Sequence, residues 1–114
     1  MKIVYNNCFG GFGLSEPAIK RYAELKGISL FPQKEKYYTI YWLEPERETT
    51  LNARDIERND PILVQVVEEL GENANGSFAD LQITKVEKGS LYRISEYDGL
   101  ESVMTVDSYD WSIA

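Results

Sequence analysis

The chain has 114 residues, a size common for one domain, and its 43% hydrophobic content with 8 Tyr, 4 Phe and 2 Trp excludes a disordered chain. One cysteine excludes an intramolecular disulfide scaffold, and the absence of histidine excludes His-based nucleophile pairs and the commonest zinc ligand. The net charge of −7 disfavours binding to nucleic-acid phosphates and to anionic membranes. We therefore expect a single domain over residues 1–114, in the cytoplasm, with no signal peptide and no membrane span.

The first third predicts a strand, a glycine-rich loop and a helix. Lys2–Asn6 is rich in β-formers, and Cys8–Leu14 holds three glycines. Ser15 is suited to cap a helix, because its hydroxyl can accept a hydrogen bond from an amide of the first turn. We expect the helix to continue to about Lys26 and to end at Gly27.

The middle of the chain predicts one strand and one surface segment. Pro32 disfavours helix in the connection that follows the first helix. Tyr37–Leu43 is the densest run of β-formers and is apolar or aromatic on both faces, which favours a central strand covered on two sides. Glu44–Asn59 is highly charged, and we interpret it as a surface excursion with a short helical turn around Ala53–Arg58.

A second helix is predicted from its capping residues and its apolar stripe. Asp60 and Pro61 are typical of the cap and the first helical position, and Gly71 is typical of a helix end. Between them, the apolar residues recur with the spacing of one helix face: Leu63, Val66, Val67 and Leu70.

The last third predicts a β-meander. Ala79–Thr84 alternates with a period of two, and Leu91–Tyr97 and Leu100–Val106 flank the dipeptide Asp98-Gly99, which favours a tight hairpin turn. Residues 107–114 alternate acidic and aromatic side chains and are interpreted as an edge strand or a frayed end.

The element order is therefore β-α-β-α-β-β-β, which predicts an α+β fold with a mostly antiparallel sheet and two helices packed on it. A curled, barrel-like sheet is the alternative architecture.

The glycine loop is the first candidate binding site. Glycines before a capped helix let backbone amides approach a ligand, the helix N-terminus favours an anion, and phenylalanine rings can stack on a planar group. The spacing matches neither the dinucleotide-binding nor the P-loop pattern, so a tight turn whose phenylalanines fill the core is the alternative. With no histidine as base, Cys8 is interpreted as a buried structural thiol. The ligand-binding candidates are Phe9, Gly10, Gly11, Phe12, Gly13 and Ser15.

Arg54 and Arg58 are further ligand-binding candidates. If a helical turn forms here, they are i, i+4 neighbours on one face and their guanidiniums make a fork for phosphate or carboxylate. The alternative is pairing with nearby acids: Asp55, Glu57 or Asp60.

An acidic group at the C-terminal end is a candidate protein-binding surface. A two-residue Asp98-Gly99 turn places Glu96 opposite Glu101, and like charges across a strand pair are destabilising unless solvent, a basic side chain or a cation offsets them. Two solvated surface carboxylates are the alternative. The candidates for protein interaction are Glu96, Glu101, Asp107 and Asp110.

The aromatic run Tyr37–Leu43 has two interpretations. A stacking platform for single-stranded nucleic acid would need a positive groove, which an acidic chain does not favour. Core packing and burial in a homo-oligomer interface explain the tyrosines better.

Four stretches resemble a group of small uncharacterised proteins carried by bacteriophages and prophages. The most specific is the opening motif Asn6–Ser15, and the others are Arg58–Pro61 with Leu63-Val64, Val66–Gly71, and Glu96–Gly99 with Glu101. The resemblance implies a viral setting, in which small accessory proteins neutralise host defences by sequestering a signalling nucleotide or by blocking a host protein. It implies no activity.

Together these features predict a non-catalytic protein that binds a small anionic, nucleotide-like ligand, needs no cofactor or metal and forms a homo-oligomer. The alternative is an acidic inhibitor of a basic host protein, and steep loss of affinity with salt would favour that alternative.

Overall fold

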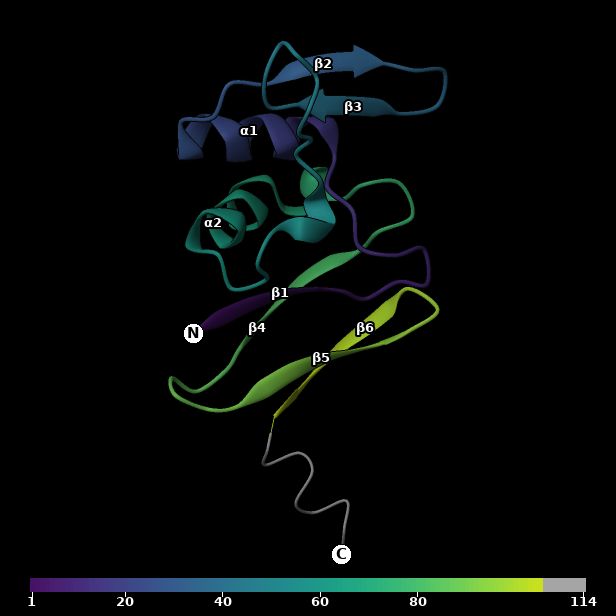
Figure 1. The fold of residues 1–114 in the computed structure, drawn as a ribbon. Coiled ribbons are helices and arrows are strands. Elements are labelled where there is room, and N and C mark those ends of the chain that lie inside the picture. The colour runs from purple at the N-terminus through teal and green to yellow at the C-terminus, as the bar shows by residue number, and fades with distance from the viewer. Residues whose placement is uncertain (106–114) are drawn as a thin grey trace, which may run out of the picture.

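A computed structural model describes residues 1–105, and over this range the chain is α+β, with two α-helices and six strands (Figure 1). None of these helices is long and apolar enough to cross a membrane. The elements are β1 (Lys2–Asn6), α1 (Glu16–Lys26), β2 (Phe31–Lys34), β3 (Thr39–Trp42), the 3-10 turn η1 (Ala53–Asp55), α2 (Pro61–Leu70), the 3-10 turn η2 (Gly71–Ala74), β4 (Leu81–Lys85), β5 (Tyr92–Tyr97) and β6 (Leu100–Thr105).

Both helices begin and end where the capping residues predict. The Ser15 hydroxyl accepts a hydrogen bond from the Ala18 amide at 3.2 Å, and Gly27 ends α1 with φ +72°. The Asp60 carboxylate accepts from the Ile62 amide at 2.8 Å, and Gly71 ends α2 with φ +56°. These ends were predictable because each depends only on residues adjacent in the sequence.

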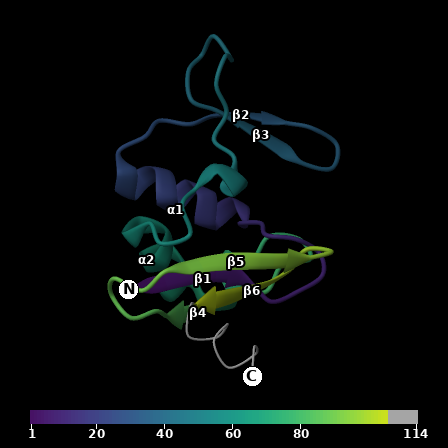
Figure 2. The ribbon, with the colours of Figure 1, turned by 60° about the horizontal axis from the view of Figure 1, so that its bottom comes forward.

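The strands form three two-stranded antiparallel sheets, so the prediction of one continuous meander is wrong. β1 pairs with β4, from Lys2 opposite Lys85 to Asn6 opposite Leu81. β5 pairs with β6 through the predicted Asp98-Gly99 turn, and this hairpin lies beside β1 without joining the sheet of β4 (Figure 2).

The aromatic run Tyr37–Leu43 is not a central strand. Only Thr39–Trp42 is extended, and it pairs with β2 in a hairpin at one end of the molecule, beyond α1 (Figure 1). Tyr37 is 85% exposed and Tyr38 is 63% exposed, so neither fills a core. The sequence analysis missed β2, which contains Pro32 and is mostly exposed.

The core lies between the two helices and the β1–β4 pair. α2 contacts α1, β1 and β4, so its apolar face is covered on several sides. All four residues of the predicted stripe belong to this core or pack against it. The buried members include Val4, Phe12, Leu14, Ala18, Tyr22, Ile56, Leu63, Val66, Val67 and Leu81, with Leu70 partly buried against them.

Candidate functional site

Three loops meet at one end of the molecule: the glycine loop after β1, the β5–β6 turn and the segment before β4 (Figure 1). A Cβ added at Gly99 would lie 2.3 Å from the carbonyl oxygen of Phe9, and one at Gly10 would lie 2.0 Å from that of Phe78. Glycine is therefore needed at both positions, because any side chain would collide with the neighbouring backbone. The glycines of the loop serve loop-to-loop packing here.

Asn6 holds all three of these loops together. Its side chain is fully buried, and Nδ2 donates to the carbonyl oxygens of Cys8 at 2.7 Å and Gly99 at 2.8 Å. Its Oδ1 accepts from the Asp80 amide at 2.8 Å. Sequence reasoning missed this residue, because a single asparagine at a strand end does not reveal partners far along the chain.

Arg58 and Glu101 form a nearly buried ion pair behind the loops. Nη1 donates to Oε1 at 2.5 Å and Nη2 to Oε2 at 2.9 Å, and Glu101 is 7% exposed. The Asn6 amide also donates to Oε1 at 2.8 Å. On its other side the guanidinium lies 3.6 Å from the centroid of the Phe12 ring. Arg58 is thus paired within the chain, but with Glu101 and not with the nearby acids considered from the sequence.

The predicted juxtaposition of Glu96 and Glu101 is confirmed by the strand register. Asp98 and Gly99 have φ +51° and +89°, as the predicted turn requires. Arg58 neutralises Glu101, and Glu96 accepts a hydrogen bond from the Gly99 amide at 3.2 Å. A basic side chain therefore offsets the repulsion between the two carboxylates.

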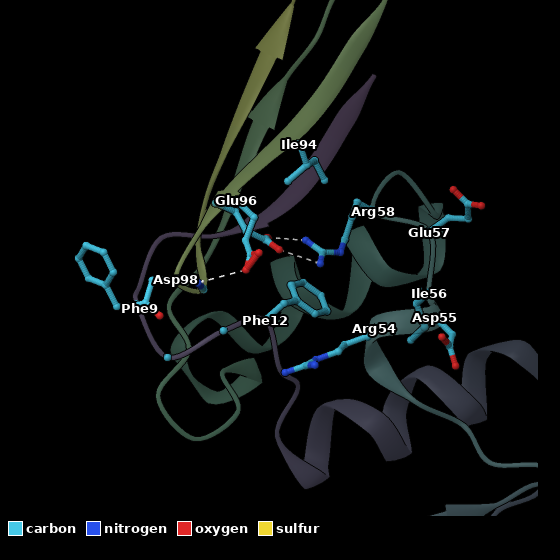
Figure 3. A pocket seen from close by; sticks show the side chains of 14 residues that line it. Phe9, Phe12, Arg54, Asp55, Ile56, Glu57, Arg58, Ile94, Glu96 and Asp98 are labelled. Carbon is cyan, nitrogen blue, oxygen red and sulfur yellow. Dashed lines mark hydrogen bonds and ion pairs between the residues drawn. The ribbon is translucent and has the colours of Figure 1, made fainter.

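A pocket of about 780 Å³ opens between the glycine loop, the η1 segment and the β5–β6 hairpin (Figure 3). It brings together two groups of candidates that the sequence analysis treated separately. Six ligand-binding candidates line it: Phe9, Gly10, Gly11, Phe12, Arg54 and Arg58. Glu96 and Glu101 also line it, together with Asp55, Ile56, Glu57, Ile94, Asp98 and Gly99.

Arg54 is the unpaired cation of this pocket. Within residues 1–105 its guanidinium makes no ion pair, and its Nη2 would lie 3.8 Å from a Cβ added at Gly11. The helical turn η1 ends at Asp55, so Arg54 and Arg58 do not share a helix face as expected. In the same range the amides of Gly10 and Phe12 donate to no protein acceptor.

The two phenylalanines of the loop have different positions. Phe12 is 7% exposed and belongs to the core, and one face of its ring is covered by Arg58. Phe9 is 60% exposed, and its ring points away from the pocket (Figure 3). In this arrangement neither ring offers an open face to a ligand inside the pocket.

Gly13 and Ser15 lie outside the pocket. The Gly13 carbonyl accepts from the Gly76 amide at 2.9 Å. The Ser15 hydroxyl donates to the Asn73 carbonyl at 2.6 Å while it caps α1. The N-terminus of α1 therefore does not contribute to the pocket. Asp107 and Asp110 lie outside the described residues.

The charges in the pocket are arranged on two sides. Figure 3 shows Arg54 and Glu96 on opposite sides of Phe12, whereas the carboxylates of Asp55 and Glu57 point away from it. Ile56 and Ile94 add apolar surface. The described part of the chain contains no cluster of His, Cys, Asp or Glu suited to hold a metal ion, and Cys8 is partly exposed.

A second, smaller cavity of about 300 Å³ lies between α1 and the β2–β3 hairpin. Its lining is mostly apolar, with Lys20 and Glu24 as the charged members beside Ala23, Ile28, Leu30, Pro32 and Tyr41. Comparisons with protein-family models, with curated proteins and with solved structures found no match for this chain.

Proposed function

We propose that the pocket between the glycine loop, Arg54 and the β5–β6 hairpin binds a small anionic, nucleotide-like ligand without catalysing a reaction. The observation that carries the proposal is the unpaired guanidinium of Arg54 beside Gly11. A volume of about 780 Å³ lies within the range of small-molecule sites.

Arg54 supplies the charge, because Arg58 is already paired with Glu101. A guanidinium presents a planar fork of N–H donors that matches a phosphate or carboxylate in a bidentate geometry. Among the described residues the amides of Gly10 and Phe12 have no acceptor, and both residues line the pocket, so they add possible donors. Arg58 contributes by packing its guanidinium against one face of the Phe12 ring.

The acidic side of the pocket, which contains Glu96 and Asp98, limits which anion can bind there. Glu96 and Asp98 are exposed carboxylates that repel a highly charged ligand such as a triphosphate. They accept hydrogen bonds from N–H donors instead. A ligand with one phosphate near Arg54 and an amino-bearing ring near Glu96 satisfies both sides, and a nucleoside monophosphate combines these groups.

Binding without catalysis fits the chemistry of the lining. The chain has no histidine, and Glu101, the most buried carboxylate of the pocket, is held by Arg58 and the Asn6 amide. Among the side chains that line the pocket within residues 1–105, none is a nucleophile with an adjacent base. The resemblance to bacteriophage proteins suggests a setting for such binding: sequestering a signalling nucleotide in the host cytoplasm.

Native mass spectrometry of the protein purified from bacteria, with and without added nucleoside monophosphates, tests the proposal. We expect a 1:1 complex that Arg54→Ala weakens by about tenfold to a hundredfold, the loss of one charge-assisted hydrogen bond. Lys88→Ala is the matched control, because it removes one exposed positive charge outside the pocket. No complex at millimolar nucleotide, or equal loss in both variants, would contradict the proposal.

A further inference from the structure

Three large aromatic side chains are exposed where the loops meet. Phe9 is 60% exposed, Phe78 is 81% exposed and Tyr97 is 77% exposed. Their backbones are held together, since Gly10 packs against Phe78 and Gly99 packs against Phe9. Figures 1 and 2 both show the three loops at the same end of the molecule. We call the surface formed by Phe9, Phe78 and Tyr97 the aromatic end.

Phe78 is in an unfavourable backbone conformation. Its φ is +65°, a left-handed value that is rare for a bulky residue and costs about 1–2 kcal/mol. The ring gains little burial within the chain that would offset this cost. The conformation is imposed by the loop, because the Gly76 carbonyl accepts from the Ala79 amide at 3.1 Å and Asn6 holds the Asp80 amide. The loop therefore holds the Phe78 backbone in this conformation and leaves its ring exposed.

Carboxylates adjoin the aromatic end. Asp98 follows Tyr97 directly, and Asp80 lies two residues after Phe78. The guanidinium of Arg54, the unpaired cation of the pocket, reaches toward the glycine loop and ends beside Gly11 (Figure 3). A second copy docked here would bring the same carboxylates, Asp80 and Asp98, to both sides of the interface, and the chain charge of −7 would repel nucleic acid. Charge complementarity thus favours a basic protein.

We propose that the aromatic end is a docking surface for a basic protein partner, which adjoins the ligand pocket at Phe9 and Asp98. The three rings would pack on apolar side chains, because aromatic residues dominate the energetics of protein interfaces. Asp80 and Asp98 would pair with lysine or arginine at the rim, which sets specificity and association rate more than affinity.

Selection of peptides from a random library displayed on yeast, with the full-length purified chain as bait, tests this docking surface. We expect enriched peptides to combine Arg or Lys with aromatic or large aliphatic residues. Their affinity, measured by fluorescence anisotropy, should fall at least tenfold in Phe78→Ser and should fall as salt is raised. Tyr37→Ser is the matched control, because Tyr37 is equally exposed but lies in the distant β2–β3 hairpin, and it should bind as the unmodified chain does.

Three outcomes would overturn the inference. These are selection of peptides without basic residues, equal loss in Phe78→Ser and Tyr37→Ser, and no enrichment over a library exposed to no bait. Sedimentation analysis adds a fourth: a dimer that Phe78→Ser dissociates would assign the surface to a second copy. Arg54→Ala separates this inference from the pocket proposal, since it should weaken nucleotide binding by about tenfold to a hundredfold and leave peptide binding intact.

Discussion

Arg58 and Glu101, 43 residues apart in the sequence, form a bidentate ion pair that joins the segment before α2 to β6. The Val4 amide donates to the Arg58 carbonyl at 2.9 Å, and the Asn6 amide donates to Glu101, so both partners are also tied to β1. This pair therefore fixes the position of the β5–β6 hairpin, and with it one wall of the pocket.

Removing one partner of this pair should destabilise the protein strongly. Arg58→Met leaves the nearly buried Glu101 carboxylate without its cation, and we expect a loss of about 3 kcal/mol in the free energy of unfolding. Urea denaturation measures it. Lys2→Met is the control, since the Lys2–Glu68 pair is exposed and should cost less than about 1 kcal/mol. Equal losses in the two variants would show that the Arg58–Glu101 pair does not hold the hairpin.

Asn6→Ala should also lower stability, by about 2–4 kcal/mol, because it leaves the Cys8 and Gly99 carbonyls and the Asp80 amide without their partner. Asn73→Ala is a matched control, since the Asn73 side chain is exposed and makes no hydrogen bond within residues 1–105. Thermal unfolding compares the two variants, and an unchanged melting temperature for Asn6→Ala would contradict the bridging role.

Gly10→Ala tests the close approach of the glycine loop to Phe78. The added Cβ would lie 2.0 Å from the Phe78 carbonyl oxygen, so the loops must separate, and we expect a loss of about 1–3 kcal/mol. Gly89→Ala is the control. Its added Cβ has no neighbour within 4 Å, so this variant carries only the strain of φ +88°, about 1 kcal/mol. Proteolysis of the loop at low protease should rise only in Gly10→Ala. Unchanged cleavage of that variant would show that the contact with Phe78 does not order the loop.

Stability should depend on pH through Tyr22 and Asp60, whose hydroxyl and carboxylate are 2.7 Å apart. Burial by itself would raise the pKa of Asp60, but hydrogen bonds from Tyr22, the Ile62 amide and Lys26 outweigh it and lower that pKa. Burial, and then the hydrogen bond to Asp60, raise the pKa of Tyr22 well above its usual value.

The two groups act at opposite ends of the pH range. Because the folded pKa of Asp60 is lowered, its stabilisation is present above the unfolded value of about 4 and is lost as the pH falls through the folded pKa. Because the folded pKa of Tyr22 is raised, its contribution is present below the unfolded value of about 10 and is lost as the pH rises above that value. Urea denaturation across pH should show that Tyr22→Phe flattens the alkaline limb, whereas an unchanged limb would contradict this assignment.

The sequence predicted the features that depend on neighbouring residues. The caps Ser15 and Asp60, the stops Gly27 and Gly71, and the Asp98-Gly99 turn all lie where local rules place them. Each works through contacts within a few residues, so no knowledge of the tertiary fold was needed.

The features that were predicted wrongly from the sequence depend on partners far along the chain. The run around Tyr37 has the composition of a covered strand, but nothing local shows that β3 forms a hairpin with β2, which contains Pro32. Likewise β4 pairs with β1 instead of extending the β5–β6 hairpin. The sequence analysis identified Arg58 and Glu101 as candidates separately, because their pairing across 43 residues appears only in three dimensions.

We propose that the pocket between Arg54 and the β5–β6 hairpin binds a nucleotide-like anion. A ¹H–¹⁵N NMR titration of the full chain with a panel of nucleoside monophosphates and inorganic phosphate tests this binding residue by residue. The proposal predicts saturable shifts at the amides of Gly10, Gly11 and Phe12 and at the Arg54 side-chain N–H groups, with the β2–β3 hairpin unaffected. Shifts confined to the cavity between α1 and that hairpin, or none at millimolar ligand, would contradict it.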